Sequence, residues 1–319
     1  MKITVDQKKA LYRYIYLGRR FEDILKDLFA ANQLAGWVHL GQGQEATGAA
    51  ISLAIGPDDY LAPYHRSRIS MMGKGMPPVQ LLSEIAGRVT GTNHGFGGEA
   101  HVVDPDHGVY ATGGIIGSNL PIAVGIAYAC KLEGKDRVTV VGCGEGGSAR
   151  GAFHESLNFA GVAKLPIVFI VENNLYAEFT PVEMELSNVN VADRGPAYGI
   201  PSAAVDGTDP EAVLKVVTEA VERARKGEGP TLIESKTYRY GGHFEGDACD
   251  YRTKDEAAEW KEKDPLPKYR AKLIAEGISE EELKEIEAAV DAELDKAVED
   301  TFKAPKPSKE DLLSQSVYA

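Results

Sequence analysis

GCGEGGSARGAFHESLNFAGVAKLPIVFIVENN, residues 142–174, contains a glycine-rich turn, a helical stretch, a continuously apolar strand and two asparagines, in that order. The run RVTVV at 137–141 precedes it, so the whole unit is a strand, a turn, a helix and a second strand. Parallel α/β sheets bind ligands at the carboxyl ends of their strands, where loops and helix N-termini converge. The glycine turn and the asparagine pair both follow such strand ends, so we expect a ligand to be held between them.

The same alternation of strands and helices continues on both sides of this unit. The strands are continuously apolar instead of alternating in polarity, which indicates a parallel sheet buried on both faces. The sequence therefore predicts an α/β fold, with a mostly parallel sheet flanked by helices. The expected elements are helix 119–132, strand 137–142, helix 152–162, strand 166–171, strand 202–205, helix 210–226 and strand 231–235.

Helical extensions are expected before and after the sheet. Apolar residues at helical spacing predict one long helix or a broken pair over 5–32, a helix after HLGQGQEA at 39–46, and another over 81–89. The glycine-rich segment 90–117 is expected to be a loop, and loops of this length are usually functional or disordered. We predict a single domain over 1–319, divided into an N-terminal helical part (1–58), an α/β core (59–253), and C-terminal helices with a tail (254–319).

Composition narrows the class of protein. The chain has 319 residues and a net charge of -13, which argues against nucleic-acid binding because neutralising phosphates requires clustered Lys and Arg. No apolar run approaches the roughly 20 residues that a membrane span needs, and the N-terminus lacks a secretory apolar core, so we expect a cytoplasmic protein without a membrane partner. The three cysteines are far apart and form no CxxC pair, which favours buried thiols over a disulfide framework or a zinc site.

Two hypotheses fit the glycine turn from its residues alone. Positions 142–147 satisfy GxGxxG between a strand and a helix, and Glu172 closes the next strand, where dinucleotide folds carry a ribose-binding acid. In the second hypothesis, the carboxylate of Glu145 and an amide oxygen of Asn174 share a hard cation. Mg²⁺ uses few protein oxygens together with substrate phosphates, which suits this supply of ligands. The second hypothesis uses every part of the stretch, whereas a dinucleotide domain leaves the preceding part of the chain unexplained.

The stretch also resembles the alpha subunit of the thiamine-diphosphate-dependent first component of 2-oxoacid and acetoin dehydrogenase complexes, whose diphosphate motif is GDG, a spacer and then NN. The resemblance covers nearly the whole chain and implies a thiamine-diphosphate-binding fold, with thiamine diphosphate and Mg²⁺ as cofactors. The segments that carry it are HLGQGQEA at 39–46, GGEAH at 97–101, GGIIGSNLPIAVGIA at 113–127, FHESLNFAGVAKLP at 153–166, ENNLYAEFTP at 172–181 and TYRYGGHFEGDACDYRT at 237–253.

The resemblance implies a role for each residue that matches a family position. The Mg²⁺ ligands would be Glu145, the Asn174 side chain and the Tyr176 backbone carbonyl. The diphosphate would contact Gly144, Gly146 and Gly147, and would be reached by His65 and Arg66. Backbone groups of Gly114 and Ile116 would face the aminopyrimidine ring. His243 matches the active-site histidine of the family's GH(S/F) loop, where it would transfer protons and stabilise developing charge.

Several positions depart from the family pattern. Glu145 replaces the usual Asp, and its extra methylene moves the carboxylate by about 1.5 Å. Gly147 stands where Ala is usual, Arg150 replaces a Glu or Gln, Arg68 replaces a frequent His, and Glu99 replaces a usual Ser. The change at Glu145 raises an alternative hypothesis, a catalytically weakened pseudo-subunit that only assembles with a beta chain.

The resemblance extends to substrate and partners. HFEGD in place of the HSxxD of pyruvate enzymes, together with NNLYAEFTP, is similar to the acetoin branch, so we expect cleavage of acetoin with acetyl transfer to lipoamide. Pyruvate is the second candidate, a branched-chain 2-oxoacid the third, and an NAD-binding oxidoreductase the most distant. The family implies an α2β2 heterotetramer with a beta subunit, the cofactor at the α/β interface, and a lipoyl-bearing acyltransferase core as acceptor.

Overall fold

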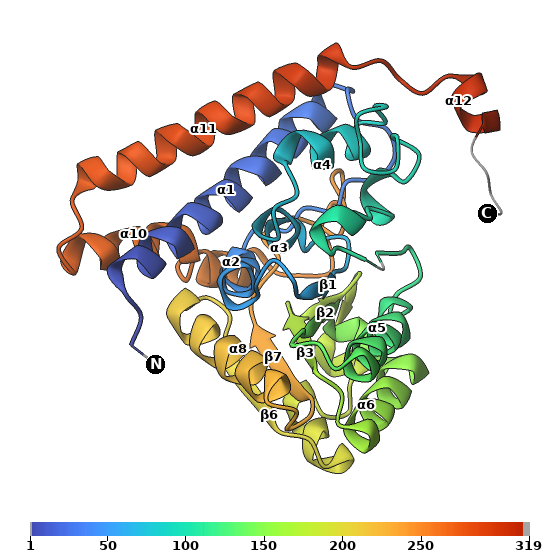
Figure 1. Cartoon of the computed structure of the whole chain (residues 1–319). Coiled ribbons are helices and arrows are strands. Elements are labelled where there is room, and N and C mark those ends of the chain that lie inside the picture. The colour runs from blue at the N-terminus through green and yellow to red at the C-terminus, as the bar shows by residue number, and fades with distance from the viewer. Residues whose placement is uncertain (1, 111, 315–319) are drawn as a thin grey trace.

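The computed structural model describes residues 2–110 and 112–314, and its centre is a five-stranded parallel sheet (Figure 1). The strands are β1 (Tyr60–Ala62), β2 (Thr139–Gly144), β3 (Ile167–Asn173), β6 (Ser202–Asp206) and β7 (Thr231–Lys236). They lie in the order β1-β2-β3-β7-β6, and every neighbouring pair is parallel. A separate antiparallel ribbon pairs β4 (Tyr176–Ala177) with β5 (Thr180–Pro181). The predicted α/β fold with a mostly parallel sheet is confirmed.

Each face of the sheet has its own apolar core, because successive side chains of a strand point to opposite faces. Val140 and Val168 belong to one core, and their neighbours Val141 and Phe169 belong to the other. The first core is covered by helices that include α2 (Glu45–Ala54) and α8 (Pro210–Arg225), and the second by α5 (Asn119–Glu133) and α6 (Gly151–Ala163).

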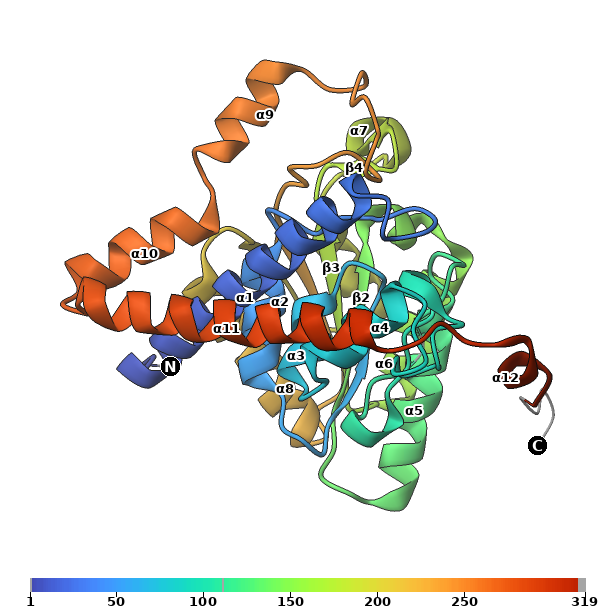
Figure 2. The ribbon, with the colours of Figure 1, turned by 90° about the horizontal axis from the view of Figure 1, so that it is seen from above.

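A further helical layer lies outside the first core. The long helices α1 and α11 run side by side across it, and α4 packs against α11 (Figures 1 and 2). In the described part of the chain, no helix is both long and apolar enough to cross a membrane. The remaining helices are α1 (Val5–Ala30), α3 (Arg68–Gly73), α4 (Pro78–Ile85), α7 (Val182–Glu185), α9 (Lys254–Lys261), α10 (Pro265–Ala275), α11 (Glu280–Lys303) and α12 (Lys309–Ser314).

Local chemistry explains why α1 is one helix and not a broken pair. Thr4 and Gln7 form a capping box at its start. Gly18 in its middle is there for packing, since a Cβ atom at this position would lie 2.2 Å from Cδ1 of Ile69. The glycine thus lets α3 approach α1 closely at little cost to the long helix.

The structure differs from the sequence prediction in four places. The strand β1 was not predicted, because three residues are too short to show a period. The strand β2 begins and ends two residues later than expected, at Thr139 and Gly144. The helix predicted over 81–89 ends at Ile85, and Gly87 follows with a left-handed φ of 64°. The loop 90–117 contains two 3-10 turns, η1 (Gly98–Ala100) and η2 (Pro105–His107).

One buried arginine joins three helices next to the sheet. The guanidinium of Arg19 on α1 donates to Glu45 at the start of α2, at 2.5 Å, and to both oxygens of Asp264 before α10, at 2.8 and 3.0 Å. The side chain of Glu45 is fully buried and that of Asp264 is 5% exposed. Neither carboxylate is well solvated, and Arg19 compensates the charge of both, although Asp264 also accepts from Lys261 Nζ at 3.0 Å.

Replacing Arg19 with methionine is therefore expected to lower the free energy of unfolding by about 3–5 kcal/mol, because it leaves the fully buried carboxylate of Glu45 without its cation. Arg20→Met is the matched control: its ion pair with Asp291 is 36% and 40% exposed, so a loss of at most about 1 kcal/mol is expected. Urea unfolding at neutral pH measures both values. Equal losses in the two variants would contradict the role given to Arg19.

The Arg19 effect also has a predicted pH dependence. Burial alone would raise the pKa of Asp264, but the hydrogen bonds and charge of Arg19 lower it below 3.8. A depressed carboxylate pKa stabilises the fold above the unfolded-state pKa, and this contribution is lost as the pH falls through the folded-state value. The stability difference between wild type and Arg19→Met should therefore narrow below about pH 4.

Candidate functional site

The glycine turn and the asparagine pair meet at the carboxyl edge of the sheet. In the β2–β3 register, Gly144 lies opposite Glu172, so Glu145 and Asn174 come just after the paired ends. Glu145 is 1% exposed, and its Oε2 accepts a hydrogen bond from the backbone N–H of Asn174 at 3.0 Å. The structure therefore brings together the carboxylate and the amide that the sequence predicted as neighbours.

The turn itself is a 3-10 helix, η3 (Glu145–Ala149), and α6 begins only at Gly151. The predicted helix 152–162 is confirmed as α6, which is one residue longer at each end. Close packing explains the glycines: a Cβ at Gly146 would lie 2.7 Å from Cβ of Ala177, and a Cβ at Gly147 would lie 3.2 Å from Cβ of Cys143. Side chains at these positions would push the turn away from β4 and β2.

The chain reverses after β3 and returns past the same turn. Leu175 has a φ of 74°, a left-handed conformation, and the amide oxygen of Asn174 accepts from the N–H of Tyr176 at 3.3 Å. The Asn174 amide nitrogen donates to Gln44 Oε1 at 2.9 Å. The carbonyl of Tyr176 accepts from Arg239 Nη1 at 3.4 Å. One carboxylate, one amide oxygen and one backbone carbonyl thus gather within a few residues of the strand ends.

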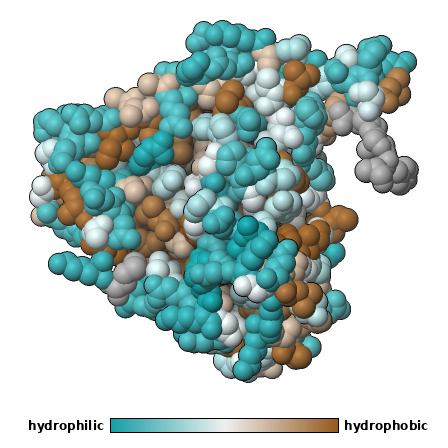
Figure 3. Space-filling model, in the orientation of Figure 1, coloured by the Kyte–Doolittle hydropathy of each residue, from teal (hydrophilic) through white to brown (hydrophobic). Residues whose placement is uncertain are grey.

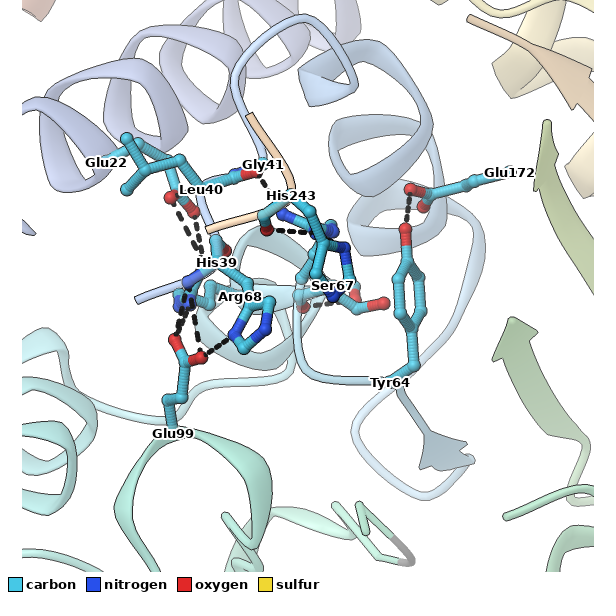
Figure 4. Close-up of polar contacts among 12 residues, drawn as sticks. Glu22, His39, Leu40, Gly41, Tyr64, Ser67, Arg68, Glu99, Glu172 and His243 are labelled. Atoms are coloured by element: carbon cyan, nitrogen blue, oxygen red, sulfur yellow. Dashed lines mark hydrogen bonds and ion pairs between the residues drawn. The ribbon is translucent and has the colours of Figure 1, made fainter. Parts of the chain in front are cut away.

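Buried acidic groups dominate the electrostatics of this edge. Burial raises the pKa of Glu145, and the nearby Glu185 carboxylate raises it further, while the N–H of Asn174 and the charge of Arg239 lower it. Burial also raises the pKa of Glu172 to about 7, and Tyr64 donates its hydroxyl to this carboxylate at 2.5 Å (Figure 4). A cation bound here would relieve the cost of burying these charges.

The polar atoms around the turn fit a charged ligand with a hard cation. Glu145, Asn174 and Tyr176 offer only oxygen, the atom type that Mg²⁺ prefers. Within the described residues, no group of three or more His, Cys, Asp or Glu side chains is placed to hold a metal, so a bound ion would need amide, carbonyl and phosphate oxygens. Buried polar atoms without a partner in the protein include Gln44 Nε2, His65 Nε2, Glu185 Oε2 and Arg239 Nε.

The structure places Arg66 against His243. Its guanidinium donates to the carbonyl of Leu40 at 2.6 Å, and to the carbonyl and Nδ1 of His243 at 2.7 and 3.2 Å. Burial, with the charge of Arg239, lowers its pKa to about 10. The neighbouring His65 is buried, and desolvation with the charge of Arg66 holds its pKa well below 6.5.

His243 lies in the loop after β7 and is neutral at physiological pH. Desolvation, followed by the charge of Arg66, lowers its pKa to about 3. Arginine has no acceptor atom, so His243 Nδ1 must accept from Arg66, and the ring proton must sit on Nε2. The backbone N–H of His243 donates to Asp247 Oδ2 at 2.6 Å, which fixes the loop. His243 therefore offers an N–H donor to its surroundings.

Gly114 and Ile116 lie in the segment before α5. The Gly114 N–H donates to Nε2 of His101 at 3.3 Å. A Cβ at Gly147 would lie 3.6 Å from Cγ2 of Ile116, which is 48% exposed. Ile116 thus borders the glycine turn, whereas Gly114 contacts His101.

Sequence reasoning missed several residues that shape the site. Arg239 is 1% exposed and donates to the carbonyls of Tyr176 and Glu178. Tyr64 binds Glu172, and Arg68 joins Glu22 and Glu99 beside His39 (Figure 4). Most of these residues stand in segments that the sequence analysis singled out, but nothing in a single sequence indicates which of their side chains are buried together.

Comparisons with known proteins agree with this geometry. The family model of the dehydrogenase E1 component matches residues 13–310. The chain is 39% identical over 315 residues to the alpha subunit of acetoin:2,6-dichlorophenolindophenol oxidoreductase from Bacillus subtilis, covering 98% of this chain and 94% of the relative. It is 40% identical over 316 residues to the protein of the same name from Cupriavidus necator, covering 98% and 95%.

The sequence similarity extends to a plant relative. The pyruvate dehydrogenase E1 component subunit alpha-3, chloroplastic, of Arabidopsis thaliana is 36% identical over 324 residues, covering 99% of this chain and 76% of the relative. The family match favours the thiamine-diphosphate hypothesis over the dinucleotide hypothesis and confirms the resemblance drawn from the motifs. The chain therefore belongs to the dehydrogenase E1 component family, whose members are thiamine-diphosphate-dependent oxidoreductases.

Proposed function

We propose that this chain is the alpha subunit of a thiamine-diphosphate-dependent dehydrogenase that cleaves acetoin and passes the acetyl group to lipoamide. The proposal rests on one observation: Glu145, Asn174 and Tyr176 lie close together at the ends of β2 and β3. Acetoin is favoured as substrate by the two bacterial relatives named for it and by HFEGD at 243–247. Pyruvate is the alternative, supported by the plant relative, and a branched-chain 2-oxoacid follows.

The proposed cofactor contacts follow from the same edge. Mg²⁺ would be held by the Glu145 carboxylate, the Asn174 amide oxygen and the Tyr176 carbonyl. The extra methylene of Glu145 is compatible with this role, because the hydrogen bond from Asn174 N–H engages only one of its two carboxylate oxygens. The other contacts are assigned to Gly144, Gly146, Gly147, His65 and Arg66 for the diphosphate, Gly114 and Ile116 for the aminopyrimidine, and His243 for the reacting side of the cofactor.

When bound, thiamine diphosphate supplies a carbanion that attacks a carbonyl and a ring that stores the resulting charge. The protein has to orient the substrate, move protons and exclude water. His243 offers its Nε2–H toward the substrate as a donor. Trp37 stacks on Phe244 at 4.8 Å between ring centroids, and Phe179 lies edge-on to His243 at 5.8 Å. These aromatic rings would form an apolar wall beside the histidine.

The cofactor assignment is tested by titrating thiamine diphosphate with Mg²⁺ into the chain co-purified with its beta subunit. Wild type should bind saturably and only with the metal, and Glu145→Ala should weaken binding by at least about 10-fold. Glu219→Ala, at an exposed position of α8, is the control and should bind like wild type. No binding by wild type, with binding restored in Glu145→Asp, would instead support the pseudo-subunit hypothesis.

The substrate is tested by comparing kcat/KM for acetoin, pyruvate and a branched-chain 2-oxoacid. Acetoin should give the highest value. Phe244→Ser removes the ring that stacks on Trp37 and should lower the ratio of acetoin to pyruvate kcat/KM by about 10-fold or more. Phe96→Ser, a change at an exposed ring in another loop, should leave the ratio unaltered. If the wild type has a higher kcat/KM for pyruvate than for acetoin, the acetoin proposal is wrong and pyruvate becomes the proposed substrate.

The relatives are alpha subunits, which implies a beta subunit as partner. We place its docking surface on the outer face of α5 and α6. Exposed apolar side chains gather there, at the lower right of Figure 3: Ile115, Ile116, Ile122, Tyr128, Leu132, Phe159 and Val162. This face is continuous with Ile116 beside the glycine turn, so a partner covering it would also close the open side of the site. An α2β2 heterotetramer, a lipoyl-bearing acyltransferase core as acceptor and a cytoplasmic location complete the proposal.

The docking surface predicts a specific assembly defect. Leu132 and Val162 are 71% and 80% exposed, so replacing both with glutamate should leave the isolated chain folded but prevent co-purification with the beta subunit. Size-exclusion chromatography with light scattering measures the assembly. Val5→Glu places the same charge on another exposed apolar residue and should assemble normally. If the double variant assembles normally, the beta subunit does not dock on this face.

A further inference from the structure

A buried cluster beside His243 has no part in the function proposed so far. It joins Glu22 on α1, His39 before α2, Arg68 at the start of α3 and Glu99 in η1 (Figure 4). These four residues lie far apart in the sequence. Two of them, Arg68 and Glu99, are positions at which the chain departs from its family's pattern.

Glu99 makes its contacts with His39 and Arg68. One carboxylate oxygen accepts from Nδ1 of His39, and both oxygens lie 3.2 Å from the His39 backbone nitrogen. Arg68 Nη2 donates to the other oxygen at 2.5 Å, and Arg68 Nη1 donates to the His39 carbonyl at 3.0 Å. Glu99 thus accepts hydrogen bonds from both the ring and the backbone of His39, and Arg68 fixes the position of the Glu99 carboxylate.

The cluster contains two carboxylates and one guanidinium, so Glu99 uses the N–H groups of His39 as donors in addition to Arg68. Arg68 is 1% exposed and lies between two buried carboxylates, because its Nη1 also donates to Glu22 at 2.9 and 3.1 Å. Burial would raise the pKa of Glu99, but the hydrogen bond from His39 and the charge of Arg68 lower it below 4.5. An ionised carboxylate can only accept, so the proton of neutral His39 sits on Nδ1 and its Nε2 carries a lone pair.

His39 and His243 are therefore held in opposite tautomers. Their rings meet edge to face, with centroids 4.8 Å apart. His243 presents Nε2–H because Arg66 donates to its Nδ1, whereas His39 presents an unprotonated Nε2 because its Nδ1–H donates to Glu99. One imidazole is set as a donor and its neighbour as an acceptor.

We propose that Glu99 is a positioning residue that fixes His39 as the proton acceptor opposite the His243 donor. This inference rests on the proposed function. When the C–C bond of acetoin breaks, the hydroxyl proton goes to His39 Nε2 and the O–H electron pair becomes the second bond of the aldehyde carbonyl. The bound cofactor would supply the sink for the C–C electron pair. The charge of Glu99 stabilises the imidazolium that results.

Several charged and titratable groups face His39 besides Glu99. They come from the segment after β1 and from the loop after β7, and they are His65, Arg66, Arg68 and His243. Glu99 is the carboxylate bound to the His39 ring. Removing its charge should therefore release the ring from the tautomer that carries its proton on Nδ1.

The experiment uses the full chain with its beta subunit and three variants: Glu99→Gln, Glu99→Asp and Glu22→Gln. Glu22→Gln is the matched control, because it removes a carboxylate from the same Arg68 without touching the His39 ring. With acetoin, Glu99→Gln should reduce kcat by about 10- to 100-fold with little change in KM. Glu99→Asp should recover part of kcat, and Glu22→Gln should leave kcat close to the wild-type value.

A second measurement is independent of activity and cofactor. The imidazole ¹⁵N shifts of the [¹⁵N]His-labelled chain, with His39 assigned through His39→Asn, should show a protonated Nδ1 and an unprotonated Nε2 in wild type. This pattern should change in Glu99→Gln and persist in Glu22→Gln. Wild-type His39 protonated on Nε2, or the same shift change in both variants, would overturn the positioning role. If the shifts behave as expected but acetoin is not turned over, the pairing stands and the proposed function fails.

Discussion

The parallel alignment of β2 with β3 is the constraint on which the rest of the structure depends. It puts Gly144 opposite Glu172, so the residues that follow each strand emerge side by side at one edge. A slip of one residue would turn alternate side chains to the other face and separate Glu145 from the Asn174 N–H. The glycines of the turn matter for the same reason, because Gly146 lets the returning β4 come close enough to bring Tyr176 to that edge. Two apolar cores, one on each face of the sheet, hold the alignment in place.

Buried arginines then bring distant loops to this edge. Arg66 connects the segment before α2 to the His243 loop, Arg68 connects α1 to η1, and Arg239 holds the chain just beyond β3. Burying a guanidinium is costly unless its donors are satisfied, so each arginine favours only loop arrangements that supply several acceptors. The same charges set the chemistry. Arg66 keeps His243 neutral with its proton on Nε2, and Arg68 keeps Glu99 ionised against His39.

The sequence was sufficient for the parts of the structure that depend on periodicity and strand order. Apolar runs located β2, β3, β6 and β7, and parallel geometry alone was enough to predict that Glu145 and Asn174 would meet. The parts of the structure that could not be predicted depend on contacts that no local sequence pattern indicates. The strand β1 has only three residues, and its place in the sheet comes from pairing with β2. The link between His39 and Glu99 spans 60 positions and two irregular segments, so single-residue arguments gave His39 little weight. Departures from the family pattern at Arg68 and Glu99 were visible in the sequence, but only the structure shows that they form one ion pair.

The central claim is that one oxygen-lined edge binds the cation of the cofactor. The most direct test is a crystal structure of the chain with its beta subunit, grown with thiamine diphosphate and Mn²⁺ in place of Mg²⁺ and recorded near the manganese absorption edge. We expect one strong anomalous peak about 2 Å from the Glu145 carboxylate, the Asn174 amide oxygen and the Tyr176 carbonyl. A peak bound elsewhere, or cofactor density with no metal at this edge, would contradict the account.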